Sequence, residues 1–158
     1  MKKLIAIIML VFLLGWLSNN VYSYINDNQF PYSKITDKIS PNDHIKQDQI
    51  KATSDTIIIN VKEAYVAGFV DSNSMDPILD ASSNGIEVIP NNPEQLNIGD
   101  IIAYEASWTS GIVIHRIIFT GYDEQGWYAI TKGDNNSIED PERVRFTQVK
   151  YLLIGIIY

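Results

Sequence analysis

Three short segments of the chain combine residue types that can perform acyl transfer. They are a serine-rich turn at 71–77, the run Ile114-His115-Arg116, and a polar loop at 131–140. A serine hydroxyl is a weak nucleophile until a base removes its proton. Histidine suits that task because its ordinary pKa lies close to neutral pH. Each segment alone is also typical of an ordinary turn or core position, so the argument depends on their combination.

A serine nucleophile with a histidine base also needs an acid behind the histidine. A carboxylate holds the imidazole in the required tautomer and stabilises the imidazolium. Asp134 and Asp140 are both candidates, because His115 lies on one arm of an expected hairpin and Thr131 ends the other. The loop after Thr131 therefore returns towards His115, and either acid is a candidate for orienting the imidazole. The other histidine, His44, is expected to be a solvated loop residue.

The elements that must position these segments are short β-rich runs separated by turn residues. This pattern predicts a mainly β domain over residues 56–158, with a hairpin loop at 121–126. The expected strands are Thr56–Val61, Ala64–Val70, Glu87–Ile89, Ile101–Tyr104, Ile112–Phe119, Trp127–Thr131 and Tyr151–Tyr158.

Residues 1–25 have the pattern of a membrane anchor or an export signal. Lys2 and Lys3 precede 14 uncharged residues, from Leu4 to Leu17. Fourteen residues are fewer than the roughly 20 that span a bilayer, but extension to Ile25 gives a tilted anchor near that length. We expect an anchor, and a signal peptide cleaved after 21–23 is the alternative. Either one places the remainder of the chain outside the cytoplasm.

Residues 26–55 form a polar stretch with isolated apolar side chains. We expect a spacer here, either a stalk or a loosely packed loop between the membrane and the domain. Ile35 and Ile39 weakly indicate a short surface helix, and a further helical turn is possible from Lys46 to Ile50.

Composition excludes several classes of site. The chain has no cysteine, which rules out a disulfide scaffold, a cysteine nucleophile and a thiolate zinc site. Two histidines make a multi-histidine metal site improbable. Twelve Lys and Arg against 19 Asp and Glu give a net charge of −7, which argues against nucleic acid as a partner. We therefore expect no metal and no cofactor.

The order of the three segments resembles the type I signal peptidase family. The matching residues are Ser74-Met75-Asp76-Pro77, then His115-Arg116, then Lys132-Gly133-Asp134-Asn135-Asn136 with Asp140, and the Gly99-Asp100 strand start also looks like the family's. The histidine resembles the branch found in the endoplasmic reticulum, archaea and some Gram-positive bacteria, because most bacterial members use lysine instead. The resemblance covers about Tyr65 to Ile157 and implies a compact signal-peptidase-like β domain behind a transmembrane helix.

The resemblance also implies a role for each matching residue. Ser74 is the expected nucleophile, His115 the general base and Asp140 the acid that orients it. Asp134 matches a second required acid with a supporting role. Ser72 matches the serine that, in the lysine branch, helps form the oxyanion hole together with the backbone N–H of the nucleophile.

Two further charged residues within the matching motifs are not expected to be catalytic. Lys132 belongs to the Gly-Asp-Asn-Asn turn rather than to the lysine position of the other branch. Arg116 alternates to the strand face opposite His115, which favours a surface or ion-pair role. The sequence departs from the family at Asn73, where glycine is usual, at Asp76 in place of Glu, and at Glu139, where many members have Asp.

For function, the resemblance implies a membrane-bound serine endopeptidase that removes N-terminal signal peptides after small residues, as in Ala-x-Ala. Its partners are then secretory preproteins and the lipid bilayer. The expected location is the cell membrane, with a single span and the catalytic domain on the extracytoplasmic side. The sequence leaves open whether the substrate set is general or specialised.

Substrate binding is expected along the strand Ala64–Val70, which leads directly into the serine turn. Family members bind an extended preprotein at strand edges, where main-chain pairing gives affinity and pockets give specificity. Val66, Phe69, Met75 and Ile78 are the candidate pocket residues, and ordinary core packing is the alternative for each.

Two other functions compete with this interpretation. One is a non-catalytic exported β module, a degenerate peptidase fold that acts in binding or assembly, motivated by Asn73 and the long spacer. The other is a self-cleaving repressor-type peptidase, which the N-terminal apolar segment and His115 both oppose.

Overall fold

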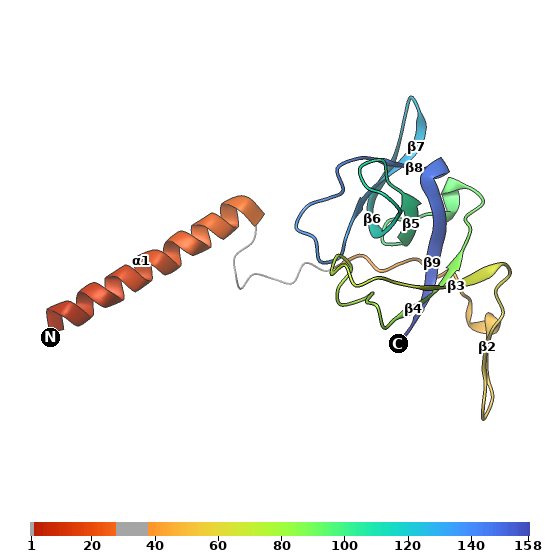
Figure 1. Cartoon of the computed structure of the whole chain (residues 1–158), viewed down its shortest axis with the longest axis horizontal. Coiled ribbons are helices and arrows are strands. Elements are labelled where there is room, and N and C mark those ends of the chain that lie inside the picture. The colour runs from red at the N-terminus through yellow and green to blue at the C-terminus, as the bar shows by residue number, and fades with distance from the viewer. Residues whose placement is uncertain (1, 28–37) are drawn as a thin grey trace. The chain divides into compact units, whose positions relative to one another are not determined.

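The computed structural model of the chain describes residues 2–27 and 38–158. These residues fall into two units, a helical N-terminal one and a β unit that begins at Lys38. The prediction of a mainly β protein with one N-terminal apolar helix is confirmed. Figure 1 shows both units.

The N-terminal unit contains one helix, α1 (Lys2–Asp27). Its segment Lys2–Tyr22 has a mean hydropathy of 2.1 and is long and apolar enough to cross a membrane, as is a signal sequence. Twenty-one residues span about 32 Å, close to the thickness of the hydrocarbon core. The polar residues after Leu17 do not end the helix, because Ser18 Oγ and Asn20 Nδ2 donate hydrogen bonds to the carbonyls of Leu14 and Trp16. Polar groups satisfied within a helix are compatible with a membrane span.

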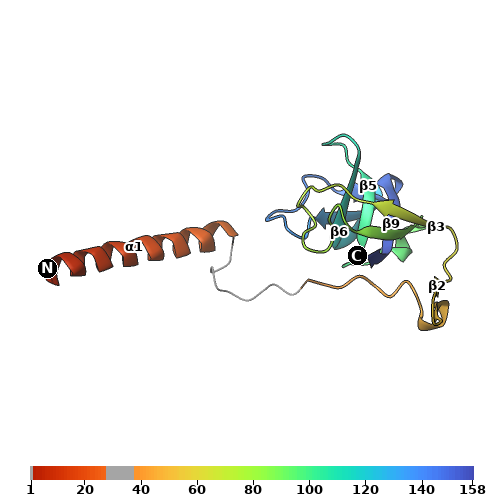
Figure 2. The same cartoon turned by 60° about the horizontal axis from the view of Figure 1, so that its bottom comes forward.

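The β unit contains a seven-stranded antiparallel sheet in the order β3-β4-β9-β5-β6-β7-β8 (Figures 1 and 2). Its strands are β3 (Ala64–Gly68), β4 (Asn84–Val88), β5 (Ile101–Glu105), β6 (Ile112–Asp123), β7 (Gly126–Lys132), β8 (Val144–Arg145) and β9 (Val149–Ile157). A separate hairpin pairs β1 (Ile50–Ala52) with β2 (Ile57–Ile59).

Both faces of the seven-stranded sheet bury apolar side chains, because neighbouring residues of β5 and β9 point to opposite faces. Ile102 and Leu152 belong to one core cluster with Tyr104, Ile117 and Trp127. Ile101 and Leu153 belong to another core cluster with Met75 and Leu79. The second cluster places Met75, the residue after Ser74, in the core.

Several boundaries differ from the predicted ones. The expected loop at 121–126 shrinks to a turn at 124–125, because Tyr122 pairs with Trp127 as β6 and β7 continue. β4 starts at Asn84 rather than Glu87. β8 has only two residues and was not predicted.

The predicted spacer at 26–55 differs most. Residues 38–55 belong to the β unit, and they include β1 and a 3₁₀ turn at Gln47–Gln49 where a helical turn was considered. The segment from Ile39 packs against Gly99, whose φ is +101° and whose added Cβ would lie 2.2 Å from Ser40 O. This backbone contact, which sequence periodicity cannot reveal, connects the segment from Lys38 to the rest of the β unit. Residues 28–37, including Ile35 of the considered surface helix, lie outside the described residues.

Candidate active site

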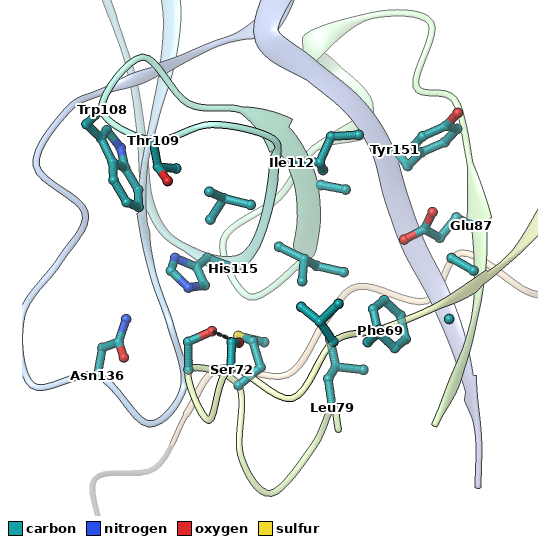
Figure 3. A pocket seen from close by; sticks show the side chains of 18 residues that line it. Phe69, Ser72, Leu79, Glu87, Trp108, Thr109, Ile112, His115, Asn136 and Tyr151 are labelled. Carbon is teal, nitrogen blue, oxygen red and sulfur yellow. Dashed lines mark hydrogen bonds between the residues drawn. The ribbon is translucent and has the colours of Figure 1, made fainter. Parts of the chain in front are cut away.

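A cavity of about 570 Å³ opens beside the end of β3, and residues of both the serine turn and β6 line it. Ser72, Ser74 and His115 all line it, although Ser74 and His115 are 41 positions apart in the chain. Figure 3 shows His115 and Ser72 at the same end of the cavity, with Asn136 beside them. All three segments predicted to carry chemistry therefore contribute to the wall of one cavity.

His115 is bound by Asp140 through its Nδ1 atom. Its Nδ1 lies 2.8 and 2.9 Å from the two carboxylate oxygens of Asp140, and both residues are buried. The backbone N–H of Asp140 donates to Thr131 O (2.8 Å), which fixes the acid against the end of β7. When Nδ1 carries the proton shared with Asp140, Nε2 is the acceptor, as a general base requires.

The hydrogen bonds around Asp140 favour its charged form. Burial acts to raise its pKa, but hydrogen bonds from His115, Thr131 and Tyr104 outweigh burial and hold the pKa below its ordinary value. Thr131 Oγ1 lies 2.6 Å and Tyr104 OH lies 2.7 Å from the same oxygen, Oδ2. Burial raises the pKa of Tyr104, so its hydroxyl stays protonated and keeps donating.

The serine turn depends on a left-handed residue. Asn73 has φ +57°, a conformation in which asparagine is among the better tolerated residues after glycine. The substitution of asparagine for the family's glycine is therefore compatible with the turn. Ser72 Oγ and Ser74 Oγ lie 3.1 Å apart, within hydrogen-bond distance.

The Gly133-Asp134-Asn135 segment clamps this turn from the other side of the site. Asn135 donates its backbone N–H to Ser74 O (2.9 Å) and its side-chain amide to Asn73 O (3.0 Å). Gly133 must lack a side chain, since an added Cβ would lie 2.5 Å from Ser74 O. The motif thus holds the backbone of the candidate nucleophile in place.

Asp134 has a different partner from Asp140. Its two oxygens accept from Arg116 Nε (2.8 Å) and Nη2 (2.7 Å), while Arg116 Nη1 donates to Gly99 O (2.7 Å). Arg116 and His115 point to opposite faces of β6, so each takes one of the two acids. The acid at His115 is Asp140. Arg116 forms the expected ion pair, but it is 5% exposed rather than on the surface.

The candidate pocket residues divide into two pairs. Phe69 and Met75 line the cavity. Val66 lies outside its wall and is 76% exposed on β3, and Ile78 packs on the core cluster that contains Met75. Lys132 also lies outside the cavity wall.

Sequence reasoning missed several residues at or near the site. Tyr104 stands in an ordinary β run and gave no signal. Thr131 was placed at the start of the polar loop but was given no role, whereas Glu87 is a charge inside a short apolar run, which was a usable signal. The expectation of a solvated His44 was wrong. Its Nε2 lies 3.0 Å from Oδ1 of the fully buried Asp100.

A serine and a histidine line one cavity, and a buried carboxylate is bound to the histidine; these are the residue types that a serine hydrolase requires. The chain is similar to proteins named signal peptidase complex catalytic subunit SEC11. It is 32% identical to that of Candida dubliniensis over 90 residues, covering 54% of this chain and 53% of the relative. It is 28% identical to that of Clavispora lusitaniae over 86 residues, covering 49% and 52%. For Scheffersomyces stipitis the identity is 29% over 90 residues, covering 54% and 53%.

These similarities confirm the resemblance to signal peptidases that the motifs indicated. The chain spans about half the length of the curated relatives it matches. No family model and no solved structure matches the chain.

Proposed function

We propose that this chain is a membrane-anchored serine endopeptidase that removes signal peptides from exported preproteins after small residues. The observation that carries the proposal is the cavity that Ser74 shares with His115, whose Nδ1 is bound to the buried Asp140. The similarity to signal peptidase catalytic subunits supports the substrate class. The apolar helix α1 supports anchoring in a membrane. Lys2 and Lys3 before the apolar run favour the extracytoplasmic side for the β unit.

In this mechanism Ser74 Oγ attacks the scissile carbonyl carbon while His115 Nε2 accepts the hydroxyl proton. The tetrahedral intermediate collapses when the imidazolium gives that proton to the leaving amine, and an acyl-enzyme remains on Ser74. Water then attacks the ester, again with His115 as the base, and releases the free acid and the enzyme. Asp140 stays ionised throughout and stabilises the imidazolium.

Ser72 and the backbone N–H of Ser74 are the proposed donors to the oxyanion. A donor placed for the developing charge is worth about 10²–10³ in rate. The short distance between the two serine hydroxyls, 3.1 Å, supports a role for Ser72 next to the reacting carbonyl.

The substrate is proposed to bind in extended form along β3. This strand is at the end of the sheet order, so among residues 2–27 and 38–158 no strand of that sheet pairs with one of its edges. Its residues Ala67 and Gly68 line the cavity that contains Ser74. An unpaired strand edge next to a cavity suits β-strand addition of a peptide.

The proposal is tested with the purified full chain and a preprotein whose signal ends in Ala-x-Ala. The wild-type chain is expected to cut after the second Ala, and Ser74→Ala and His115→Ala are each expected to abolish cutting. Ser82→Ala, an exposed serine eight residues from Ser74, is the matched control and should retain activity. Full activity in His115→Ala together with loss in Lys132→Ala would show that the base is wrong.

A serine-directed acylating probe distinguishes this proposal from a non-catalytic β module. The wild-type chain should be labelled at Ser74, as read by peptide mass spectrometry. A folded chain that is not labelled at Ser74 would favour the binding module.

A further inference from the structure

Glu87 is a buried acid in the wall of the same cavity. It lies on β4 and is 4% exposed. Figure 3 shows its carboxylate pointing into the cavity, at the opposite side from His115 and Asn136. Among the described residues no group donates a hydrogen bond to this carboxylate, and no Lys or Arg belongs to the cavity wall. Burial raises the pKa of Glu87 accordingly.

The pairing of β4 with β9 is irregular at Glu87, and this irregularity directs the Glu87 side chain into the cavity. Glu87 is opposite Leu153 of β9, but its neighbour Ile86 is opposite Gly155, so β9 has one extra residue at this point. Such bulges redirect side chains and are frequent next to active sites. Gly85 admits the Phe69 ring, because an added Cβ at Gly85 would lie 2.5 Å from Phe69 Cζ.

The remaining wall near Glu87 is largely apolar. Ala67, Phe69, Ala103 and Tyr151 line the cavity together with the acid. A lysine or arginine side chain suits such a site, since its methylene stem packs on apolar surface while its charged end binds a carboxylate. A purely apolar side chain would leave the carboxylate without a partner, which is unfavourable.

The distance from Glu87 to the reacting groups limits which substrate residue it meets. β4 and β6 are three strands apart in the sheet order, so they are separated by roughly 14 Å at 4.7–4.9 Å per strand. An extended peptide covers that distance in about four residues. The residue at Glu87 is therefore not the one at the scissile bond.

We propose that Glu87 forms a substrate subsite that selects a lysine or arginine side chain several residues from the scissile bond. The inference rests on the proposed function, because it treats the cavity as a peptide-binding cleft. It adds a specificity for charge that the small residues at the cut do not provide.

Binding to the full-length Ser74→Ala chain tests the subsite without hydrolysis. The probes are fluorescein-labelled decapeptides that contain Ala-x-Ala. Each has one test residue, either lysine or its uncharged near-isostere norleucine, and the test residue is placed in turn at every position outside the Ala-x-Ala motif. At one position the lysine peptide is expected to bind about tenfold tighter by fluorescence anisotropy. Adding Glu87→Gln should bring the two peptides within twofold of each other, as should Glu87→Leu. Glu124→Gln, an exposed acid in the β6–β7 turn, should leave the preference intact.

The outcomes separate the two proposals. Equal binding of lysine and norleucine peptides at every position, or a preference that survives Glu87→Gln in a folded chain, overturns the subsite. Cleavage of the norleucine peptide by the chain with Ser74 intact supports the proposed function independently. A lysine preference that depends on Glu87, without cleavage of any peptide, supports the subsite and overturns the peptidase function.

Discussion

At the scale of single residues, the main feature of the site is that His115 and Arg116 each bind a different acid. Asp140 contacts His115 and Asp134 contacts Arg116, although both acids belong to one loop after β7. Spacing along the sequence could not separate them, because both follow Thr131 closely. Because neighbouring residues of β6 face opposite sides of the sheet, His115 and Arg116 cannot share one acid, and each binds its own.

The charge of Asp140 gives the first prediction. Asp140→Asn keeps the size of the side chain but removes the negative charge and disfavours the tautomer with a proton on Nδ1. We expect kcat for peptide cleavage to fall by about 10³–10⁴-fold, with little change in KM. Glu139→Gln changes the exposed neighbour and should retain activity. A loss smaller than tenfold in a folded Asp140→Asn chain would contradict the role.

The raised pKa of Glu87 gives a prediction about stability. Its folded-state pKa lies above the ordinary value of 4.5, so the stability associated with its protonation is present below pH 4.5 and lost as pH rises through the folded-state value. Glu87→Gln removes this loss because the amide does not ionise. We expect a melting temperature about 2–5 °C above that of the wild type at neutral pH. The difference should disappear below pH 4.5, and an equal difference at all pH values would contradict the assignment.

At the scale of elements, the serine turn is positioned by the loop after β7 as well as by its own left-handed residue, Asn73. Asn135 donates two hydrogen bonds to the backbone of Asn73 and Ser74, and Gly133 leaves room for Ser74 O. The backbone position of Ser74, the proposed nucleophile, thus depends on a second segment about 60 residues further along the chain. A nucleophile displaced by about 1 Å can lose about 10² in rate.

Gly133→Ala tests this dependence. The added Cβ would meet a backbone oxygen at 2.5 Å, so the serine turn or the loop must move. We expect kcat to fall by about 10²-fold, while circular dichroism still shows the β fold. Gly155→Ala is the control, because its Cβ finds only ordinary contacts of 3.4 Å and more with Ile86. Full activity of Gly133→Ala would show that the clamp does not position Ser74.

The predictable elements were those with long apolar patterns. The runs that became β5, β6 and β7 are rich in β-branched residues, and the sequence predicted all three. β1 and β8 were missed because they are three and two residues long and lie among polar residues. The serine, the histidine and both acids were identifiable from their motifs. The sequence showed Glu87 only as a charge in a short apolar run, and its place in the cavity wall depends on the irregular pairing of β4 with β9, which that run does not reveal.

At the scale of the β unit, a polar network connects its first residues to the site. Asp100, which is fully buried, accepts from the backbone N–H groups of Asn42 and Asn97, both at 2.8 Å, and lies 3.0 Å from His44. Arg116 Nη1 donates to Ile39 O (3.3 Å), next to its ion pair with Asp134. The segment that looked like a spacer is thereby part of the support of the site.

Asp100→Ala should therefore destabilise the β unit. It leaves the part-buried N–H groups of Asn42 and Asn97 without their acceptor, and each should cost an amount at the lower end of the about 1–3 kcal/mol of a buried unsatisfied group. We expect a loss on the order of 3 kcal/mol in the free energy of unfolding, measured by urea denaturation of the full chain. Asp43→Ala, which changes an exposed acid in the same segment, should shift it by less than about 0.5 kcal/mol. A loss no larger than that of the control would show that the network is dispensable.

For the whole chain, the proposed role of the apolar helix α1 as a membrane anchor gives the last prediction. Leu10 and Leu13 lie near the middle of the candidate span and are three residues apart, so they share a helix face. Replacing both by arginine should cost about 2.5–3.5 kcal/mol each at the centre of a bilayer, which is enough to prevent stable insertion. We expect the wild-type chain to float with lipid vesicles in a density gradient and the doubly substituted chain to remain at the bottom. Leu10→Ile with Leu13→Ile should float like the wild type, and flotation of the arginine variant would contradict a membrane-spanning role. Because the substitutions lie in α1, cleavage of a short soluble peptide should persist in the arginine variant while cleavage of a vesicle-inserted preprotein falls.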